Sequence, residues 1–232
     1  MEIKKLHKRI KKLEKKINDL ENVTVFKSIR KNINSWACIF VALYFLSDNY
    51  PTGLLTFLFL FFLSYFLHIQ SHEYTNFLTL AHRYHHAHNN FFSHFIQYVI
   101  ELGAPVIFLL IYYLFGTILV DKWVVLFTAP FYSSIHNINY GYFKVNQVHS
   151  LHHSNPTTNV GPDICDILFA TKHPGDPIED TSHYIPNIII LAVCVLLLKR
   201  YCNHDTLFTY IIYFLILSAI TFLIFSLVLY KT

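Results

Sequence analysis

The chain has little charge: charged residues make up 14% of its 232 residues, against 54% hydrophobic and 17% aromatic residues. Most of the positive charge lies in residues 1–35, which contain eleven Lys/Arg and four acids; residues 36–232 contain seven and ten. The apolar residues fall in long runs, which excludes an ordinary soluble domain and indicates transmembrane helices. Only Phe26 interrupts the basic tail with an aromatic ring, so a tail beside anionic lipid is favoured over nucleic-acid binding.

Cysteine is also scarce. The four cysteines form no CxxC pair, and two of them, Cys38 and Cys194, lie inside apolar runs. This pattern excludes a disulfide framework and a cysteine-type zinc site, and it indicates reduced thiols in or beside the cytosol. No signal peptide is visible, so the first apolar run, which starts near Trp36, is expected to be a retained span.

The basic tail contains a heptad repeat. One heptad position holds Ile3, Ile10 and Ile17, and the other holds Leu6, Leu13 and Leu20. Isoleucine and leucine in this order favour a parallel two-stranded coiled coil, which predicts a homodimer formed through residues 1–22. The alternative is a single amphipathic helix that lies on the membrane surface.

Six apolar stretches follow the tail, at roughly 34–47, 53–71, 95–120, 123–143, 185–199 and 206–230. Polar breaks at 47–53, 120–122 and 199–206 are typical of turns and group the stretches into three hairpins. We therefore predict an all-α, multi-span transmembrane helical bundle. The expected domains are a basic amphipathic or coiled-coil tail (1–33) and a membrane-embedded catalytic domain (34–232), whose histidine-box core covers about 53–183. With the N-terminus in the cytoplasm, fifteen Lys/Arg fall on the cytoplasmic side and three on the other.

Histidine, by contrast, is abundant: the chain has fifteen. They concentrate in one HxxxH box and two HxxHH boxes, with one more histidine upstream of the last box: His68, His72, His82, His85, His86, His136, His149, His152 and His153. Spacings of three and four residues place imidazoles on one helix face, and neutral imidazole suits Zn, Cu, Fe and Ni. The boxes therefore predict a metal centre on the cytoplasmic side. The isolated His7, His94 and His204 are expected to be ordinary surface or interior residues.

The boxes and their surroundings resemble the integral-membrane fatty acid hydroxylase/sterol desaturase superfamily. Beyond the boxes, the likeness includes Asn159-Val-Gly161, the run Asp163 to Thr171 and the segment His136 to Gly141, and it covers roughly residues 53–172. Two positions depart from that family: Ala170 replaces a usual glycine, and Tyr140 stands where some members have another histidine.

The resemblance implies a histidine-rich cytosolic cap that holds two iron ions, with zinc as a possible replacement in purified protein. By position, the nine box histidines inherit the ligand role. His183 is the first choice for a further ligand, with His88 and His173 as alternatives. The resemblance also implies O2 as oxidant, a cytochrome b5-type or similar electron donor, and residence in the endoplasmic reticulum with the boxes facing the cytosol.

The implied function is hydroxylation or desaturation of a fatty acyl or sterol-like lipid. Two alternatives stay open at this point: an ether-lipid or sphingolipid desaturase of the histidine-box type, and an inactive metal-binding membrane scaffold. Asp163 and Asp166 have two interpretations as well. They either accept hydrogen bonds from ligand imidazoles or cap and turn the chain.

Overall fold

The computed structural model describes residues 4–7, 9–11, 14, 23–76, 79–88, 90–115, 120–146 and 148–231. All regular structure within these residues is helical, and no strand occurs among them, which confirms the all-α prediction. The elements are α2 (Val25–Lys31), α3 (Ile33–Leu46), α4 (Tyr50–Glu73), α5 (Leu80–Ala87), α6 (Phe91–Phe115), α7 (Lys122–Ser134), η1 (Ile135–Tyr142), α8 (Val148–Ser154), α9 (Asp163–Leu168), η2 (Ser182–Tyr184), α10 (Ile185–Tyr201) and α11 (His204–Lys231). Each of the six predicted apolar stretches forms a helix.

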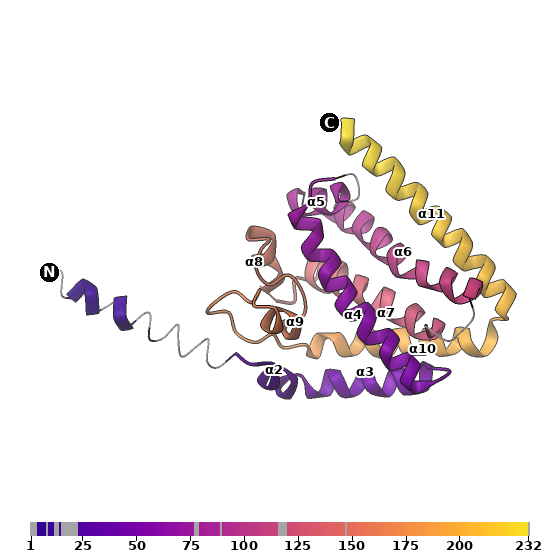
Figure 1. Cartoon of the computed structure of the whole chain (residues 1–232), viewed down its shortest axis with the longest axis horizontal. Coiled ribbons are helices and arrows are strands. Elements are labelled where there is room, and N and C mark those ends of the chain that lie inside the picture. Colours follow the sequence, from indigo (N-terminus) through magenta and orange to yellow (C-terminus); the bar gives the residue numbers. More distant parts are fainter. Residues whose placement is uncertain are drawn as a thin grey trace.

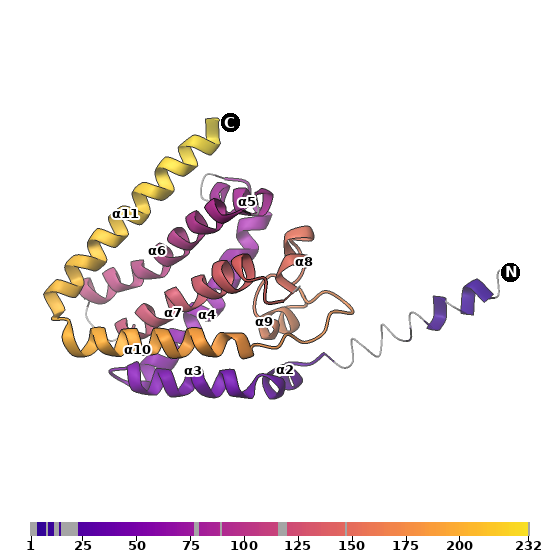
Figure 2. The ribbon, with the colours of Figure 1, turned by 180° about the vertical axis from the view of Figure 1, so that it is seen from behind.

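Helix α7 is the centre of the bundle. It packs against α4, α6 and α10, while α3 packs on α4 and α10, and α11 lies along α6 (Figures 1 and 2). Val124, Val125 and Phe127 of α7 are completely buried. Because it has neighbours on several sides, α7 also buries polar side chains, those of Thr128, Ser133 and Ser134.

In the described part of the chain, three helical segments are long and apolar enough to cross a membrane: Tyr50–Glu73, Phe91–Leu110 and Ser182–Tyr201. The apolar helices Ile33–Leu46 and Thr209–Phe225 are shorter. The outward faces of these helices remain apolar, as at Val41, Leu55 and Ile190, which are more than half exposed. Apolar surface on this scale is unfavourable in water and is the pattern expected of helices that contact lipid.

The loops at one end of the bundle are tied together by charged side chains. Asp121 caps α7, because its Oδ1 accepts hydrogen bonds from the amides of Trp123 and Val124 at 3.0 and 3.2 Å. Its Oδ2 accepts another from the amide of Asp48 at 2.8 Å, and Asp48 also pairs with Lys199 at 2.9 Å. These contacts join the three polar breaks predicted as turns. The histidine-bearing helices α5 and α8 lie at the opposite end (Figure 1).

The start of α3 is hydrogen-bonded to the loop that contains Glu179 and Thr181. Asn32 donates from Nδ2 to the carbonyl of Glu179 at 3.0 Å and accepts from the amide of Thr181 at 2.9 Å. Ser35 donates to the carbonyl of Thr181 at 2.9 Å. Residues 25–35 therefore pack as part of the bundle. Of the heptad positions, Leu6 and Ile10 are helical and exposed, and the other four lie outside the described residues.

Candidate metal centre

Four elements bring the box histidines to one end of the bundle: the C-terminal end of α4, and α5, η1 and α8. His68 and His72 occupy the last two turns of α4, and α5 turns back toward them after a short connection. His136 lies on η1, a stretch of π-helix that continues α7. Such widened turns are rare and occur frequently at functional sites, since they redirect one side chain without ending the helix.

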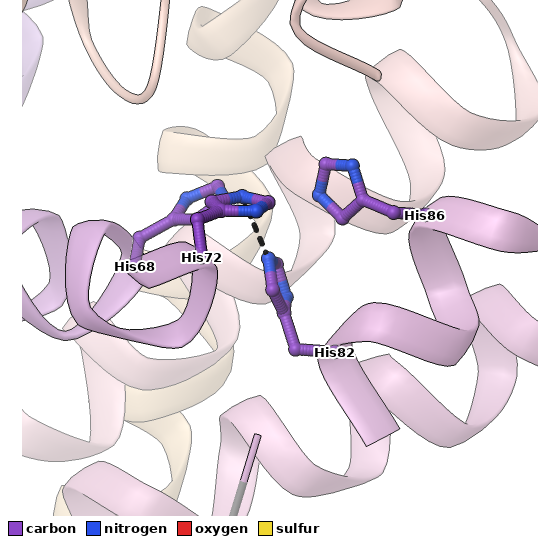
Figure 3. A group of neighbouring side chains, drawn as sticks. All are labelled: His68, His72, His82 and His86. Carbon is purple, nitrogen blue, oxygen red and sulfur yellow. Dashed lines mark hydrogen bonds between the residues drawn. The ribbon is translucent and has the colours of Figure 1, made fainter. Parts of the chain in front are cut away.

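The first histidine group consists of His68, His72, His82 and His86, with His152 beside them. Ring nitrogens of the first four all lie within 4.8 Å of one another, and Figure 3 shows their rings turned toward a common point. The Nε2 atom of His152 lies 3.1 Å from the Nε2 atoms of both His68 and His72. Five imidazoles from three helices therefore surround one position.

The second histidine group consists of His85, His136, His149 and His153, whose ring nitrogens also lie within 4.8 Å of one another. The Nε2 atoms of His149 and His153 are 3.1 Å apart. The two groups are adjacent, because the rings of His86 and His153 stack with centroids 4.2 Å apart. The arrangement thus offers nitrogen donors for two neighbouring ions.

The helical period explains how each HxxHH box is divided. Residues i and i+4 point in nearly the same direction from a helix, whereas i+3 points to the other side of i. His82 and His86 accordingly share the first group while His85 belongs to the second. In the last box His149 and His153 share the second group, whereas His152, three residues after His149, turns to the first.

Burial favours the neutral form of the imidazoles in the two HxxHH boxes, because it lowers the pKa of each of them. It lowers the pKa of His152 and of His153 from 6.5 to about 3, with the neighbouring imidazoles adding to the effect for both. The same causes lower the pKa of His85 and His86. Both ring nitrogens of His85 and His86 and the Nε2 of His136 are buried without a hydrogen-bond partner. Buried nitrogens that lack a partner are unfavourable unless they bind something, so the donor set fits transition-metal ions.

These pKa shifts predict an acid-sensitive metal-free protein. A histidine whose folded pKa lies below 6.5 binds a proton more readily when unfolded, so stability is lost as pH falls from 6.5 toward 3, by about 1.4 kcal/mol per pH unit and group. Burial raises the pKa of Asp166 and of Glu179 to about 7, so these two acids have the opposite effect on stability. They favour the folded state at low pH, and this stabilisation is lost as pH rises toward 7. The lowered histidines outnumber these two acids.

We therefore expect the unfolding temperature of chelator-treated protein in detergent to be lower at pH 5 than at pH 7. Thermal melts at the two pH values measure this difference. An unfolding temperature at pH 5 equal to or above that at pH 7 would contradict the burial of neutral imidazoles in the centre. Because bound metal competes with protons for the same nitrogens, reloaded protein should tolerate pH 5 better.

Two ligand candidates are fixed by acceptors that orient their rings. His152 donates from Nδ1 to the carbonyl of Thr158 at 2.9 Å. His136 donates from Nδ1 to Oε1 of Glu101 at 2.5 Å. In each case Nδ1 carries the hydrogen, so the lone pair of Nε2 is available to a metal. The sequence analysis did not predict Glu101 as a site residue. The signal that could have identified it is the presence of an acid inside the apolar stretch 95–120.

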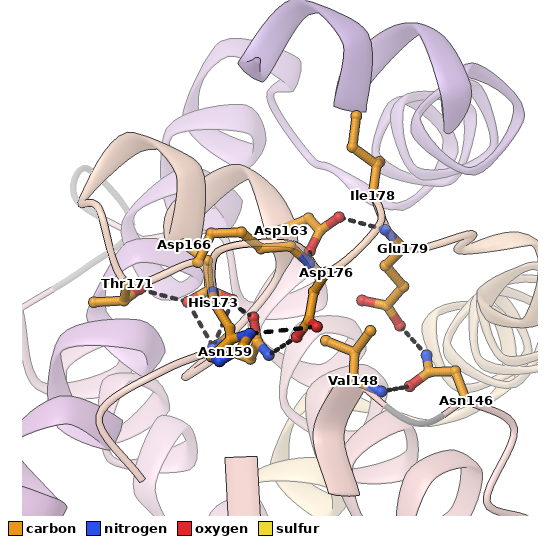
Figure 4. A network of polar contacts seen from close by, with 12 residues as sticks. Asn146, Val148, Asn159, Asp163, Asp166, Thr171, His173, Asp176, Ile178 and Glu179 are labelled. Carbon is orange, nitrogen blue, oxygen red and sulfur yellow. Dashed lines mark hydrogen bonds and ion pairs between the residues drawn. The ribbon is translucent and has the colours of Figure 1, made fainter. Parts of the chain in front are cut away.

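Asp163 and Asp166, in the loop that follows the last histidine box, form hydrogen bonds and an ion pair within that loop (Figure 4). Asp166 accepts a hydrogen bond from Thr171 at 2.6 Å, and Asp163 pairs with Lys172 at 2.5 Å. Their partners within the described residues include no histidine ring, so the structure supports the interpretation that they shape the chain. Glu179, on the same network, accepts a hydrogen bond from Tyr140.

Tyr140, which departs from the family pattern, packs directly on the centre. Its ring stacks on that of His149, with centroids 4.9 Å apart and planes 19° apart. Its hydroxyl contacts Glu179 and, at 2.6 Å, Tyr184. Tyr140 therefore supports a histidine where some relatives of the proposed family would supply one.

Nine of the ten predicted ligands lie in the two groups, and His183 is the exception. Its Nδ1 lies 3.0 Å from the carbonyl of Asp180, and its ring contacts Tyr140 rather than another histidine. His183 therefore lies outside both groups, and its Nε2, which is buried without a hydrogen-bond partner, lies 3.7 Å from Oε1 of Glu179. The alternatives His88 and His173 are exposed and also lie outside both groups.

His94 differs from the expectation of an isolated residue. It is 8% exposed, and its ring contacts that of His85 edge to face at 4.4 Å. Gly141 makes room for it, because a Cβ atom at that position would lie 2.3 Å from the His94 ring. The contact between His94 and His85 could not be predicted from their spacing in the sequence, because it depends on how α5, α6 and η1 pack in the fold. His7 is exposed, and the side chain of His204 lies outside the described part of the chain.

Within the described residues, two mainly apolar cavities inside the bundle reach the centre, and a third, more open hollow touches His72, His86 and His153 from outside. The first, of about 120 Å³, touches His68, His136 and His149, and thus both groups. The second, of about 170 Å³, touches His68 and His82 of the first group only. Leu60, Ser64, His68 and Tyr132 line both cavities. The rest of the first cavity includes Ile39, Phe57, Thr128, Phe131, Val160 and Ile164.

Comparison of the chain with protein-family profiles, curated proteins and solved structures finds no match. The likeness to the fatty acid hydroxylase/sterol desaturase superfamily therefore depends on the box motifs and the loop that follows them. The geometry of this chain gives separate evidence for a metal centre. It places the histidines in two adjacent groups and an apolar cavity in contact with both.

Proposed function

We propose that the protein is a membrane di-iron oxygenase that hydroxylates or desaturates a lipid. The observation that carries this proposal is the first cavity, whose apolar walls end at His68 of one histidine group and at His136 and His149 of the other. An apolar cavity at a candidate metal centre suits a ligand recognised by burial of an alkyl chain.

The chain itself would contribute three things. Nine imidazoles would hold two ions, Thr158 and Glu101 would orient two of those imidazoles, and the cavity would place one part of an alkyl chain beside both ions while excluding water. Iron bound there would supply O2 activation and one-electron redox chemistry, with electrons from a cytochrome b5-type or similar donor. The position of the chain relative to the ions decides whether hydroxylation or desaturation follows.

The membrane arrangement is part of the same proposal. The apolar outer faces contact lipid, and the helices form a multi-span bundle with the histidine cap on the cytosolic side of the endoplasmic reticulum. Supporting this orientation, Lys122 and Lys199 contact Asp48 at the loop end of the bundle, whereas α2, which carries Arg30 and Lys31, packs beside α9 toward the histidine end (Figure 1).

Elemental analysis of full-length protein, purified without chelator, tests the metal. We expect about two transition-metal ions per chain, with zinc in place of some iron where it competes during purification. His149→Ala, which removes one donor from the second group, should retain about one. Folded wild-type protein without metal would contradict the proposal.

Lipid profiling of cells that express the protein tests the reaction. A hydroxylated or newly unsaturated fatty acyl or sterol-like lipid should accumulate with wild-type protein and not with His149→Ala. A vinyl-ether or sphingolipid product would instead establish the ether-lipid or sphingolipid desaturase alternative. Metal-loaded protein that changes no lipid, in cells with a competent electron donor, would establish the scaffold alternative.

A further inference from the structure

Glu101 is in direct contact with the ligand candidate His136, and it lies on a helix that supplies none of the nine ligand candidates. It is on α6, within the candidate span Phe91–Leu110, and its side chain is 10% exposed. A carboxylate inside such a span is unfavourable unless it has partners, and it is usually retained for a function.

Both carboxylate oxygens contact residues of η1, the element that carries His136 of the second histidine group. Oε1 accepts a hydrogen bond from Nδ1 of His136 at 2.5 Å, and Oε2 accepts one from Nδ2 of Asn137 at 2.7 Å. With its Nδ1 hydrogen held in this way, the buried Nε2 of His136, which has no hydrogen-bond partner, is directed toward the other histidines of its group. The carboxylate thereby fixes both the tautomer and the orientation of the ring.

A second connection leads to the first group. Gln97, one helical turn before Glu101, donates from Nε2 to Oε1 of Glu101 at 2.9 Å. The same amide lies 3.2 Å from Nδ1 of His82, and both Gln97 and His82 are less than 9% exposed. One face of α6 thus contacts an outer ring nitrogen in each histidine group.

We propose that Glu101 is a positioning residue that orients His136 for metal binding and, through Gln97, restrains His82 in the neighbouring group. This inference rests on the proposed function only in requiring that the histidine groups bind metal. Glu101 would act through His136 without contacting the metal itself. Removal of a carboxylate that orients a ligand histidine typically weakens metal binding or activity by about 10- to 100-fold.

The test compares Glu101→Gln and Glu101→Leu with Glu73→Gln, a control at an exposed position on α4. Each full-length variant is purified, stripped and titrated with Co2+ against a competing chelator, and its absorption spectrum is recorded. We expect two Co2+ ions in wild-type protein and in Glu73→Gln. In Glu101→Gln one of the two should bind about 10- to 100-fold more weakly, with an altered spectrum, and Glu101→Leu should be affected more strongly.

A double variant locates the effect. If Glu101 acts through the second group, Glu101→Gln should add little to the loss that His149→Ala causes in that group, because contributions to one site are not additive. Unchanged Co2+ affinities and spectra in both Glu101 variants would overturn the inference while leaving the metal centre intact. Absence of Co2+ binding in wild-type protein would instead overturn the proposed function.

A purely structural role predicts a different result. In that case Glu101→Gln would lower the unfolding temperature of the metal-free protein, while the folded fraction would bind both Co2+ ions with wild-type affinity and spectrum. That outcome also overturns the proposal, and it remains measurable with Glu101→Gln even where Glu101→Leu does not fold.

Discussion

Replacement of His85 or His152 by alanine is expected to abolish lipid oxidation and to reduce metal content. Both residues are completely buried, and both offer nitrogens to the interior of the centre. The Nε2 of His152 lies 3.1 Å from that of His68 and from that of His72, and the His85 ring lies 5.2 Å from that of His136. Loss of one imidazole leaves an ion with an open position and removes part of its control over redox chemistry.

The matched control is His88→Ala, which should leave metal content and oxidation close to wild type. His88 ends the same helix as His85, but it is exposed and stacks on Tyr84 at 4.2 Å, away from both histidine groups. His94→Ala is less suitable as a control than its isolated position in the sequence suggests, since it contacts His85. Metal analysis and lipid product should be measured on the same preparations. A His85→Ala protein with two ions and normal turnover would remove the basis for both groups.

The helices were predictable because their signals are local. Long apolar runs, the polar breaks around Asp48, Asp121 and Asn203, and the cap formed by Asp121 are all visible within a few residues of sequence. The histidine boxes were visible for the same reason, since spacings of three and four residues identify neighbours on one helix face. Their division between two groups also follows from that spacing once the direction of each helix is known.

The rest depended on contacts between distant segments. Glu101 meets His136 across 35 residues, and Tyr140 meets His183 across more than 40. No local pattern encodes the rotation of α6 that directs Glu101 inward, and none shows that the fold leaves His183 outside both histidine groups. The sequence also left two interpretations of Asp163 open, acceptor to a ligand imidazole or shaper of the chain, and only the fold shows that its side chain pairs with Lys172.

The first cavity, on which the proposed function rests, leads to a second prediction with a large expected loss of activity. Thr128→Phe should reduce lipid oxidation roughly 100-fold while both ions stay bound, because displacement of a substrate by about 1 Å can cost that much. Thr128 lines the first cavity and not the second, and its hydroxyl is buried without a hydrogen-bond partner. Its replacement therefore breaks no hydrogen bond, and the added ring occupies the space assigned to the alkyl chain.

Leu63→Phe is the matched control, since Leu63 lines only the second cavity, which reaches the first histidine group alone. It should retain most activity, because a substrate in the first cavity would not meet the added ring. Overpacking typically costs about 1–3 kcal/mol, so unfolding temperatures and metal content must be compared for both variants. Loss of product in Leu63→Phe with activity retained in Thr128→Phe would assign the substrate to the second cavity. Full activity in both variants would mean that neither cavity holds the substrate, and the argument from the first cavity to lipid oxidation would fail.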